Sequence, residues 1–130
     1  MTTWITICDT CKREGWELTA MERTDGELLA SLIEATAQAA PVSTPVATRR
    51  VSCTMGCERA CNIIIQGPGK IGYSLGKFDP TPEAAEAIVA YATQHAASPT
   101  GQVPFRDWPL GVKGHFVSRH VPLPEAVKPQ

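Results

Sequence analysis

The sequence predicts one α/β domain with a mixed four-stranded sheet, two main helices and an extended, proline-rich C-terminal tail. Short β-branched stretches indicate the strands, and two stretches of helical periodicity between capping signals indicate the helices. Residues 99–130 hold six prolines and no periodic apolar pattern, which indicates the tail. With 130 residues, of which 43% are hydrophobic, the chain suffices for one packed core. We therefore divide it into a domain, residues 1–98, and a tail, residues 99–130, that packs on the domain or on a partner.

Four stretches are predicted as strands. Trp4–Cys8 alternates and is rich in β-branched residues, and Val46–Val51 has a similar composition. Cys61–Gln66 contains a continuous apolar run, which indicates a central position in the sheet. The Gly-Pro-Gly-Lys sequence at 67–70 is typical of a turn, and the alternating stretch Lys70–Gly76 then closes a hairpin.

Two helices are predicted from their caps and spacing. The Thr-Asp-Gly-Glu sequence at 24–27 fits a capping box, and the helix that follows must end before Pro41. The second helix has Thr81 as its cap and Pro82 in its first position, and it ends at Ser98-Pro99.

The resulting order, β-α-β-β-β-α, is the thioredoxin-like arrangement. The first β-α-β unit should be parallel and the hairpin antiparallel, which gives a mixed sheet with helices packed on its faces. In the tail we expect no element longer than a short helical turn. Four side chains are expected to pin the tail to the body or to a partner: Phe105, Trp108, Leu110 and Phe116.

Charge and hydropathy argue against several classes of function. The net charge is −1, which argues against nucleic-acid binding by bulk charge. No run approaches the roughly 18 apolar residues that a membrane span needs. The N-terminal residues lack the basic and apolar regions of a signal peptide, so we expect a cytoplasmic protein. In that reducing compartment, clustered cysteines more often bind metals or react than form structural disulfides.

The five cysteines follow the first two predicted strands. Cys8 and Cys11 come at the end of the first strand, and Cys53, Cys57 and Cys61 stand between the second and the third. The carboxyl ends of parallel strands lie at the same edge of a sheet, and the 41 residues between Cys11 and Cys53 suffice for the crossover. Thiolates bind soft metals and iron–sulfur clusters, and most such sites need four of them. The sequence therefore predicts a metal or iron–sulfur site at this edge.

Several motifs resemble known families. Cys53-Thr-Met-Gly-Cys57 resembles the second cysteine pair of the thioredoxin-like [2Fe-2S] ferredoxins, and that match covers roughly the first 95 residues. Nearly the whole chain is similar to a bacterial family of predicted metal-binding proteins, the DUF1636 family. The stretches that carry this second resemblance are Ile7-Cys-Asp-Thr-Cys11, Cys53–Cys61, Gly67–Lys70 with Tyr73, and Val103–Pro109.

The ferredoxin resemblance implies that Cys8, Cys11, Cys53 and Cys57 hold a [2Fe-2S] cluster, with Cys61 as a spare or alternative ligand. The chain departs from the ferredoxins in two places. Its first two cysteines are more closely spaced, and Cys61 stands where those proteins have a proline that faces the site. Two other arrangements therefore stay open: Cys61 replaces a member of the first pair, or a subset of the cysteines holds a [4Fe-4S] cluster shared between the subunits of a homodimer.

These inferences favour a non-enzymatic protein that carries single electrons or senses redox state and docks a redox partner protein. No catalytic triad, carboxylate pair or nucleotide motif stands out in the sequence. A first alternative is a structural zinc site that stabilises an interaction module. A second is a thiol-disulfide oxidoreductase that uses Cys8 and Cys11, which would leave the other three cysteines unexplained. A third is a set of ordinary buried thiols.

Other polar residues bear on such a site. Basic residues near the cysteines in sequence would raise the reduction potential of a cluster, unless they form ordinary solvated surface. These residues are Lys12, Arg13, Arg49, Arg50 and Arg59. The three histidines share no ligand spacing with the cysteines, and we expect them to be surface or partner-contact residues. They are His95, His115 and His120.

Overall fold

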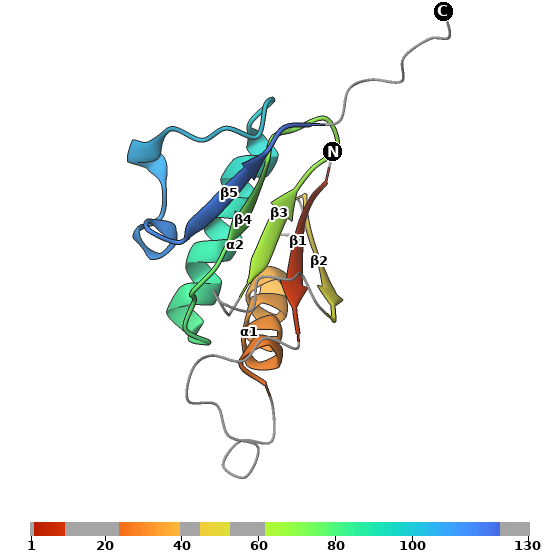
Figure 1. Ribbon diagram of the computed structural model, residues 1–130, viewed down its shortest axis with the longest axis vertical. Coiled ribbons are helices and arrows are strands. Elements are labelled where there is room, and N and C mark those ends of the chain that lie inside the picture. Colours follow the sequence, from red (N-terminus) through yellow and green to blue (C-terminus); the bar gives the residue numbers. More distant parts are fainter. Residues whose placement is uncertain (1, 10–23, 40–44, 53–61, 123–130) are drawn as a thin grey trace, which may run out of the picture.

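The computed structural model describes residues 2–9, 24–39, 45–52 and 62–122, and it shows a five-stranded mixed sheet with two α-helices (Figure 1). In chain order the elements are β1 (Thr3–Cys8), α1 (Asp25–Ala39), β2 (Val46–Val51), β3 (Ile63–Gln66), β4 (Gly72–Leu75), α2 (Pro82–Ala97), the short 3-10 turns η2 (Phe105–Asp107) and η3 (Leu110–Val112), and β5 (Phe116–His120). The predicted α/β class and the predicted order through α2 are confirmed.

The strands follow the spatial order β2-β1-β3-β4-β5. β1 pairs in parallel with β2 and antiparallel with β3, as a β-α-β unit followed by a hairpin requires. The β3–β4 and β4–β5 pairs are also antiparallel. β3 is the middle strand of the five, and Ile63 and Ile65 on it are fully buried, as its continuous apolar run predicted.

The prediction of four strands was wrong by one. β5 lies within the predicted tail and pairs antiparallel with β4, with Ser118 opposite Ser74 and Phe116 opposite Leu75. The sequence of β5 does not alternate between buried and exposed positions as a typical strand does. Phe116 is half-buried, and the four residues that follow it are exposed. Its pairing with β4 supplies the backbone hydrogen bonds that local sequence does not indicate.

Both helices pack on the same face of the sheet, so the prediction of helices on both faces was also wrong (Figure 1). The core lies between this face and the helices, and its members are mostly aliphatic. The largest fully buried aliphatic side chains are Ile5, Ile7, Leu29, Ile33, Ile63, Ile65, Leu75 and Ile88. The other face is more open, and there the side chain of Trp4 is 40% exposed.

The predicted helix caps are present. The backbone N–H of Glu27 donates to the Thr24 hydroxyl at 3.1 Å, and that of Ala84 donates to the Thr81 hydroxyl at 3.2 Å. Pro82 occupies the start of α2, where its missing N–H costs no hydrogen bond. Within the described ranges, neither helix is long and apolar enough to cross a membrane.

Aromatic residues anchor the segment after α2. The rings of Trp108 and Phe116 stack with centroids 4.3 Å apart, and both pack near Tyr91 of α2. These two predicted anchors therefore contact the body. Phe105 contacts Trp108 but has 63% of its surface exposed, and Leu110 is 83% exposed.

Candidate metal centre

Of the five cysteines, Cys8 lies within the described residues, at the last position of β1. Its side chain is only 1% exposed. The thiol lies 3.9 Å from the carbonyl oxygen of Ser52, at hydrogen-bonding distance for sulfur. Because Ser52 directly precedes Cys53, this contact joins the first cysteine segment to the second.

The ends of β1 and β2 lie side by side, as the topology argument predicted. Cys8 is opposite Val51 in the parallel register, and the N–H of Asp9 donates to the carbonyl of Val51 at 3.0 Å. The two strands therefore end at the same level of the sheet. The chain leaves both strands there and enters the two segments that contain the remaining cysteines.

The start of β3 reaches the same place. The N–H of Cys8 donates to the carbonyl of Asn62 at 3.2 Å, and Asn62 is buried. Asn62 directly follows Cys61. The segment of residues 53–61 thus begins beside Cys8, at Ser52, and ends beside it, at Asn62.

The first turn of α1 packs against the end of β1. The Thr24 hydroxyl donates to the carbonyl of Asp9, and a Cβ atom on Gly26 would lie 2.1 Å from the carbonyl oxygen of Cys8. Only glycine allows the helix to approach this closely. The positive end of the helix dipole therefore lies beside Cys8, where it favours nearby negative charge.

The other predicted ligands, Cys11, Cys53, Cys57 and Cys61, lie outside the described residues. The structure does describe the residues from which their segments start and to which they return. Those residues are Asp9, Thr24, Ser52 and Asn62. The carbonyls of Ser52 and Asn62 accept from Cys8, and Asp9 is hydrogen-bonded to Val51 and to Thr24. The residues that flank the two cysteine groups therefore lie together, and the meeting of the cysteines themselves stays a prediction.

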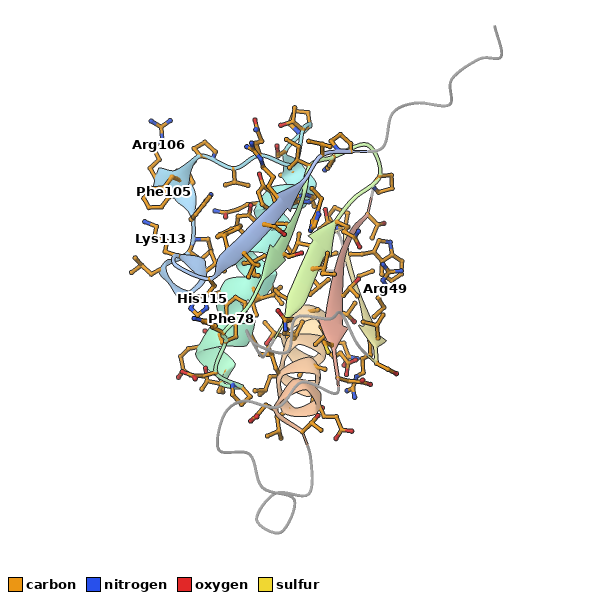
Figure 2. All side chains as sticks on the ribbon, in the orientation of Figure 1. Arg49, Phe78, Phe105, Arg106, Lys113 and His115 are labelled. Atoms are coloured by element: carbon orange, nitrogen blue, oxygen red, sulfur yellow. The ribbon has the colours of Figure 1, made fainter. Side chains whose placement is uncertain are left out.

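Two of the predicted basic neighbours already have partners. Arg50 forms a bidentate ion pair with Glu34 of α1, with N–O distances of 2.7 and 2.9 Å. Arg49 donates to the Thr6 hydroxyl at 2.7 Å and lies over the ring of Trp4 on the open face of the sheet (Figure 2). The charge of Arg50 is thus balanced by Glu34. Lys12, Arg13 and Arg59 fall outside the described ranges.

The prediction of a surface position was wrong for His95, which is fully buried. Its Nε2 lies 2.7 Å from the carbonyl of Ile71 and its Nδ1 lies 2.9 Å from the hydroxyl of Thr3. The sequence placed it near a helix C-terminus but gave no sign of these partners from other elements. His115 is half-buried and stacks on Phe78, whereas His120 is exposed (Figure 2).

No group of three or more His, Cys, Asp or Glu side chains within the described ranges is arranged to hold a metal ion. A metal centre built on Cys8 would therefore need further ligands from outside the described ranges, where Cys11, Cys53, Cys57 and Cys61 lie. The arrangement around Cys8 can supply one buried thiol and bring both of those segments to it.

A family model described as "Protein of unknown function (DUF1636)" matches residues 5–122 of the chain. The protein belongs to the DUF1636 family. The match covers every described strand except the first two residues of β1. No curated protein matches the sequence significantly.

Among solved structures, this DUF1636 protein is similar to a thioredoxin-like [2Fe-2S] ferredoxin from Aquifex aeolicus. The two share 13% sequence identity and a TM-score of 0.57, over 93% of this chain and 94% of the ferredoxin. The similarity shows that the fold is thioredoxin-like, and it extends through the C-terminal part that contains β5.

Proposed function

We propose that this DUF1636 protein is a non-enzymatic iron–sulfur protein that carries single electrons or senses redox state. The observation that carries the proposal is the convergence at Cys8. The residues flanking both cysteine-containing segments meet there through backbone and side-chain hydrogen bonds. Four thiolates gathered at one place form the ligand set of most iron–sulfur clusters.

The chemistry of the available donors fits such a group. Cys8, Cys11, Cys53 and Cys57 would hold it, and when bound it would supply reversible one-electron reduction. The similarity in fold to a [2Fe-2S] ferredoxin supports a cluster of that type. The nearby N-terminus of α1 would stabilise the negative charge of the thiolates.

Cys61 has a particular position in this ligand set. It is bonded directly to Asn62, whose carbonyl accepts the hydrogen bond from the Cys8 N–H. Asn62 is therefore placed beside Cys8, and Cys61 is its neighbour in the chain. This supports Cys61 as an alternative ligand and keeps the sets with Cys61 in place of Cys11, or with a [4Fe-4S] cluster, within the proposal.

The burial of Cys8 argues against the oxidoreductase alternative. In a dithiol enzyme the attacking thiolate must be partly exposed to reach its substrate. The Cys8 side chain is 1% exposed, which suits a ligand or a structural thiol better than a nucleophile. We accordingly propose that the protein acts through a redox partner protein in a reducing compartment such as the cytoplasm, and not through thiol chemistry on a substrate.

Metal analysis of the anaerobically purified full chain tests the proposal. We expect visible absorption with equal amounts of iron and acid-labile sulfide, about two of each per chain for a [2Fe-2S] cluster. Each cysteine is then changed singly to serine, a nearly isosteric change that keeps the buried volume. In the favoured ligand set, Cys61→Ser keeps the iron, whereas Cys8→Ser, C11S, C53S and C57S lose most of it.

The same variants separate the alternatives. If iron is lost from C61S but kept in C11S, the ligand set with Cys61 in place of Cys11 is correct. A colourless protein that holds one zinc ion and no sulfide would contradict the iron–sulfur proposal and support the zinc-stabilised interaction module.

A further inference from the structure

A cavity of about 690 Å³ lies between β5 and the segment that leads from α2 to η2. Figure 1 shows this segment leaving the end of α2, swinging away from the sheet and returning to it at the start of β5. One wall of the cavity is β5, the opposite wall is residues 102–104, and Tyr73 and Trp108 line it between them. Its volume is in the range of ligand-binding pockets.

The cavity runs along the edge of the sheet. Four successive residues of β5, residues 116–119, line it. Ser118 and Arg119 are successive residues opposite Ser74 and Tyr73, so their side chains point to opposite faces, and a cavity lined by both follows the edge and not a single face. β5 is the last strand of the sheet, and no other described strand pairs with its outer side. The outer N–H and C=O groups of β5 therefore make no ladder hydrogen bond to a described strand, and the residues that carry them line this cavity.

The walls of the cavity are held in place by contacts of their own. The indole N–H of Trp108 donates to the carbonyl of Val103 at 2.8 Å, and the amide of Gln94 on α2 donates to the carbonyl of Asp107 at 2.6 Å. The N–H of Ile71 donates to the carbonyl of Thr100 at 2.9 Å. The far wall is thus fixed at both ends, and a ligand would not have to organise it.

The lining combines an aromatic surface with one positive charge. Tyr73 packs edge-to-face on Phe116, with centroids 5.4 Å apart, and Phe116 stacks on Trp108. Arg119 is the charged residue of the lining, and it forms no ion pair with any residue that the structure describes. An acidic group would complement it.

The register of β4 and β5 shows how the aromatic Phe116 and the charged Arg119 are placed relative to each other. Phe116 lies opposite Leu75 and Arg119 lies opposite Tyr73, which is two positions from Leu75. The register shifts between Ser74 and Leu75, and Val117 is the extra residue of β5 at this bulge. Because directly opposite residues of paired strands share a face, Phe116 and Arg119 point to the same side of the sheet although they are three positions apart. A strand that follows the register of β4 on the other side of β5 would likewise meet them with side chains two positions apart.

We propose that this groove is a docking site for an extended segment of a partner protein, which adds to β5 as a further strand. The segment carries an apolar residue that packs on Phe116 and Trp108, and an acidic residue two positions away that pairs with Arg119. Main-chain hydrogen bonds to the free edge supply affinity, and the two side-chain contacts supply specificity. The proposal is independent of the metal centre.

Titration of the isotope-labelled full chain with a short synthetic peptide tests the proposal. The peptide alternates threonine with valine and glutamate, so that a valine and a glutamate stand two positions apart. We expect its addition to shift the amide resonances of residues 116–120 and to slow their hydrogen exchange. A matched peptide with lysine in place of glutamate should bind about fivefold more weakly, as expected for loss of a partly exposed ion pair.

Charge-reversed variants locate the contact. Arg119→Glu should reverse the preference, so that the lysine peptide binds more tightly than the glutamate peptide. Arg106→Glu is the matched control, because Arg106 lies on η2 outside the cavity lining and is exposed (Figure 2). R106E should bind both peptides as the wild-type chain does.

Four results would overturn the proposal. The first is no change in β5 amides at millimolar peptide, and the second is an equal effect of R119E and R106E. The third is undiminished binding of a peptide with proline in place of the threonine between valine and glutamate, which would indicate side-chain capture without strand pairing. The fourth is a concentration-dependent dimer that protects β5 without peptide, since the occupant would then be a second copy of the chain.

Discussion

At the scale of single residues, His95 joins three parts of the chain. A carbonyl can only accept a hydrogen bond, so Nε2 carries the proton and donates to Ile71, and Nδ1 accepts from the Thr3 hydroxyl. The ammonium of Lys70 is close by and donates to the carbonyl of His95 at 3.0 Å. The ring lies between β1, α2 and the turn before β4, and its burial together with the nearby ammonium favours the neutral imidazole.

This arrangement predicts a dependence of stability on pH. Burial, and secondarily the charge of Lys70, lowers the pKa of His95 below its ordinary value of 6.5. The unfolded chain then binds a proton more readily than the folded one. Stability contributed by His95 is complete above about pH 6.5 and declines as the pH falls towards the lower folded pKa, by at most about 1.4 kcal/mol per pH unit.

Urea unfolding between pH 5.5 and pH 7.5, roughly the window of this titration, measures the effect. His95→Gln should flatten the decline, because glutamine does not titrate. The exposed His120 provides the control, and H120Q should follow the wild-type curve. An equal slope in the wild type and H95Q would show that His95 is not held neutral in the fold.

At the scale of elements, the contact between α1 and β1 determines whether the cysteine edge can form. Gly26 lies in the first turn of α1, against the carbonyl of Cys8 and the backbone of Asp9. Backbone atoms cannot move aside as the end of a flexible side chain can. The helix and the strand are therefore coupled at the position of Cys8.

Gly26→Ala should push the first turn of α1 away from the end of β1. Alanine normally stabilises a helix by up to about 1 kcal/mol relative to glycine. Here its Cβ must displace backbone, and we expect a loss of about 1–3 kcal/mol in the free energy of unfolding, together with a lower iron content.

Gly67→Ala is the control for this substitution. A Cβ atom at Gly67 would meet only side-chain atoms, at 3.4 Å, so a change within about 0.5 kcal/mol is expected. Stabilisation of the chain by G26A would contradict the close approach of α1 to Cys8.

At the scale of the whole molecule, the hydrophobic core includes Cys8 but consists mainly of aliphatic side chains that are not candidate metal ligands. Ile5, Ile65, Leu29 and Ile88 are fully buried between the sheet and the helices. They need no metal to pack. This differs from small zinc domains, which have too little core to fold without their ion.

Removal of the proposed cluster by a chelator under oxidising conditions should therefore leave the fold in place. We expect the far-ultraviolet circular dichroism to be retained and the unfolding midpoint to fall. Loss of hydrogen-exchange protection should be confined to residues near Cys8, Asp9 and Asn62. Global unfolding on metal removal would show that the metal organises the whole domain, as the zinc-module alternative requires.

Much of this architecture could be predicted because its signals are local. The bounds of β2 were predicted to the residue, and the Thr81 cap with Pro82 located the start of α2. The position of the ends of β1 and β2 side by side followed from the rule for parallel strand ends. Each of these inferences uses residues that are close in sequence or a general property of strand order.

The missed features all depend on distant partners. β5 forms because β4 is available to pair with it, and neither Phe116 nor the polar residues after it indicate a strand alone. The burial of His95 depends on Thr3, which is 92 positions away. The groove along β5 requires the fold of the segment after α2, where prolines had favoured an extended tail.

The two sites also differ in where the chain encodes them. Every described residue at the cysteine edge lies at or before Asn62, whereas β5 and the opposite wall of the groove lie after α2. A growing chain therefore contains the whole cysteine edge before the groove has been synthesised. Substitutions in residues 100–120 could change the choice of partner across the family and leave the ligands untouched.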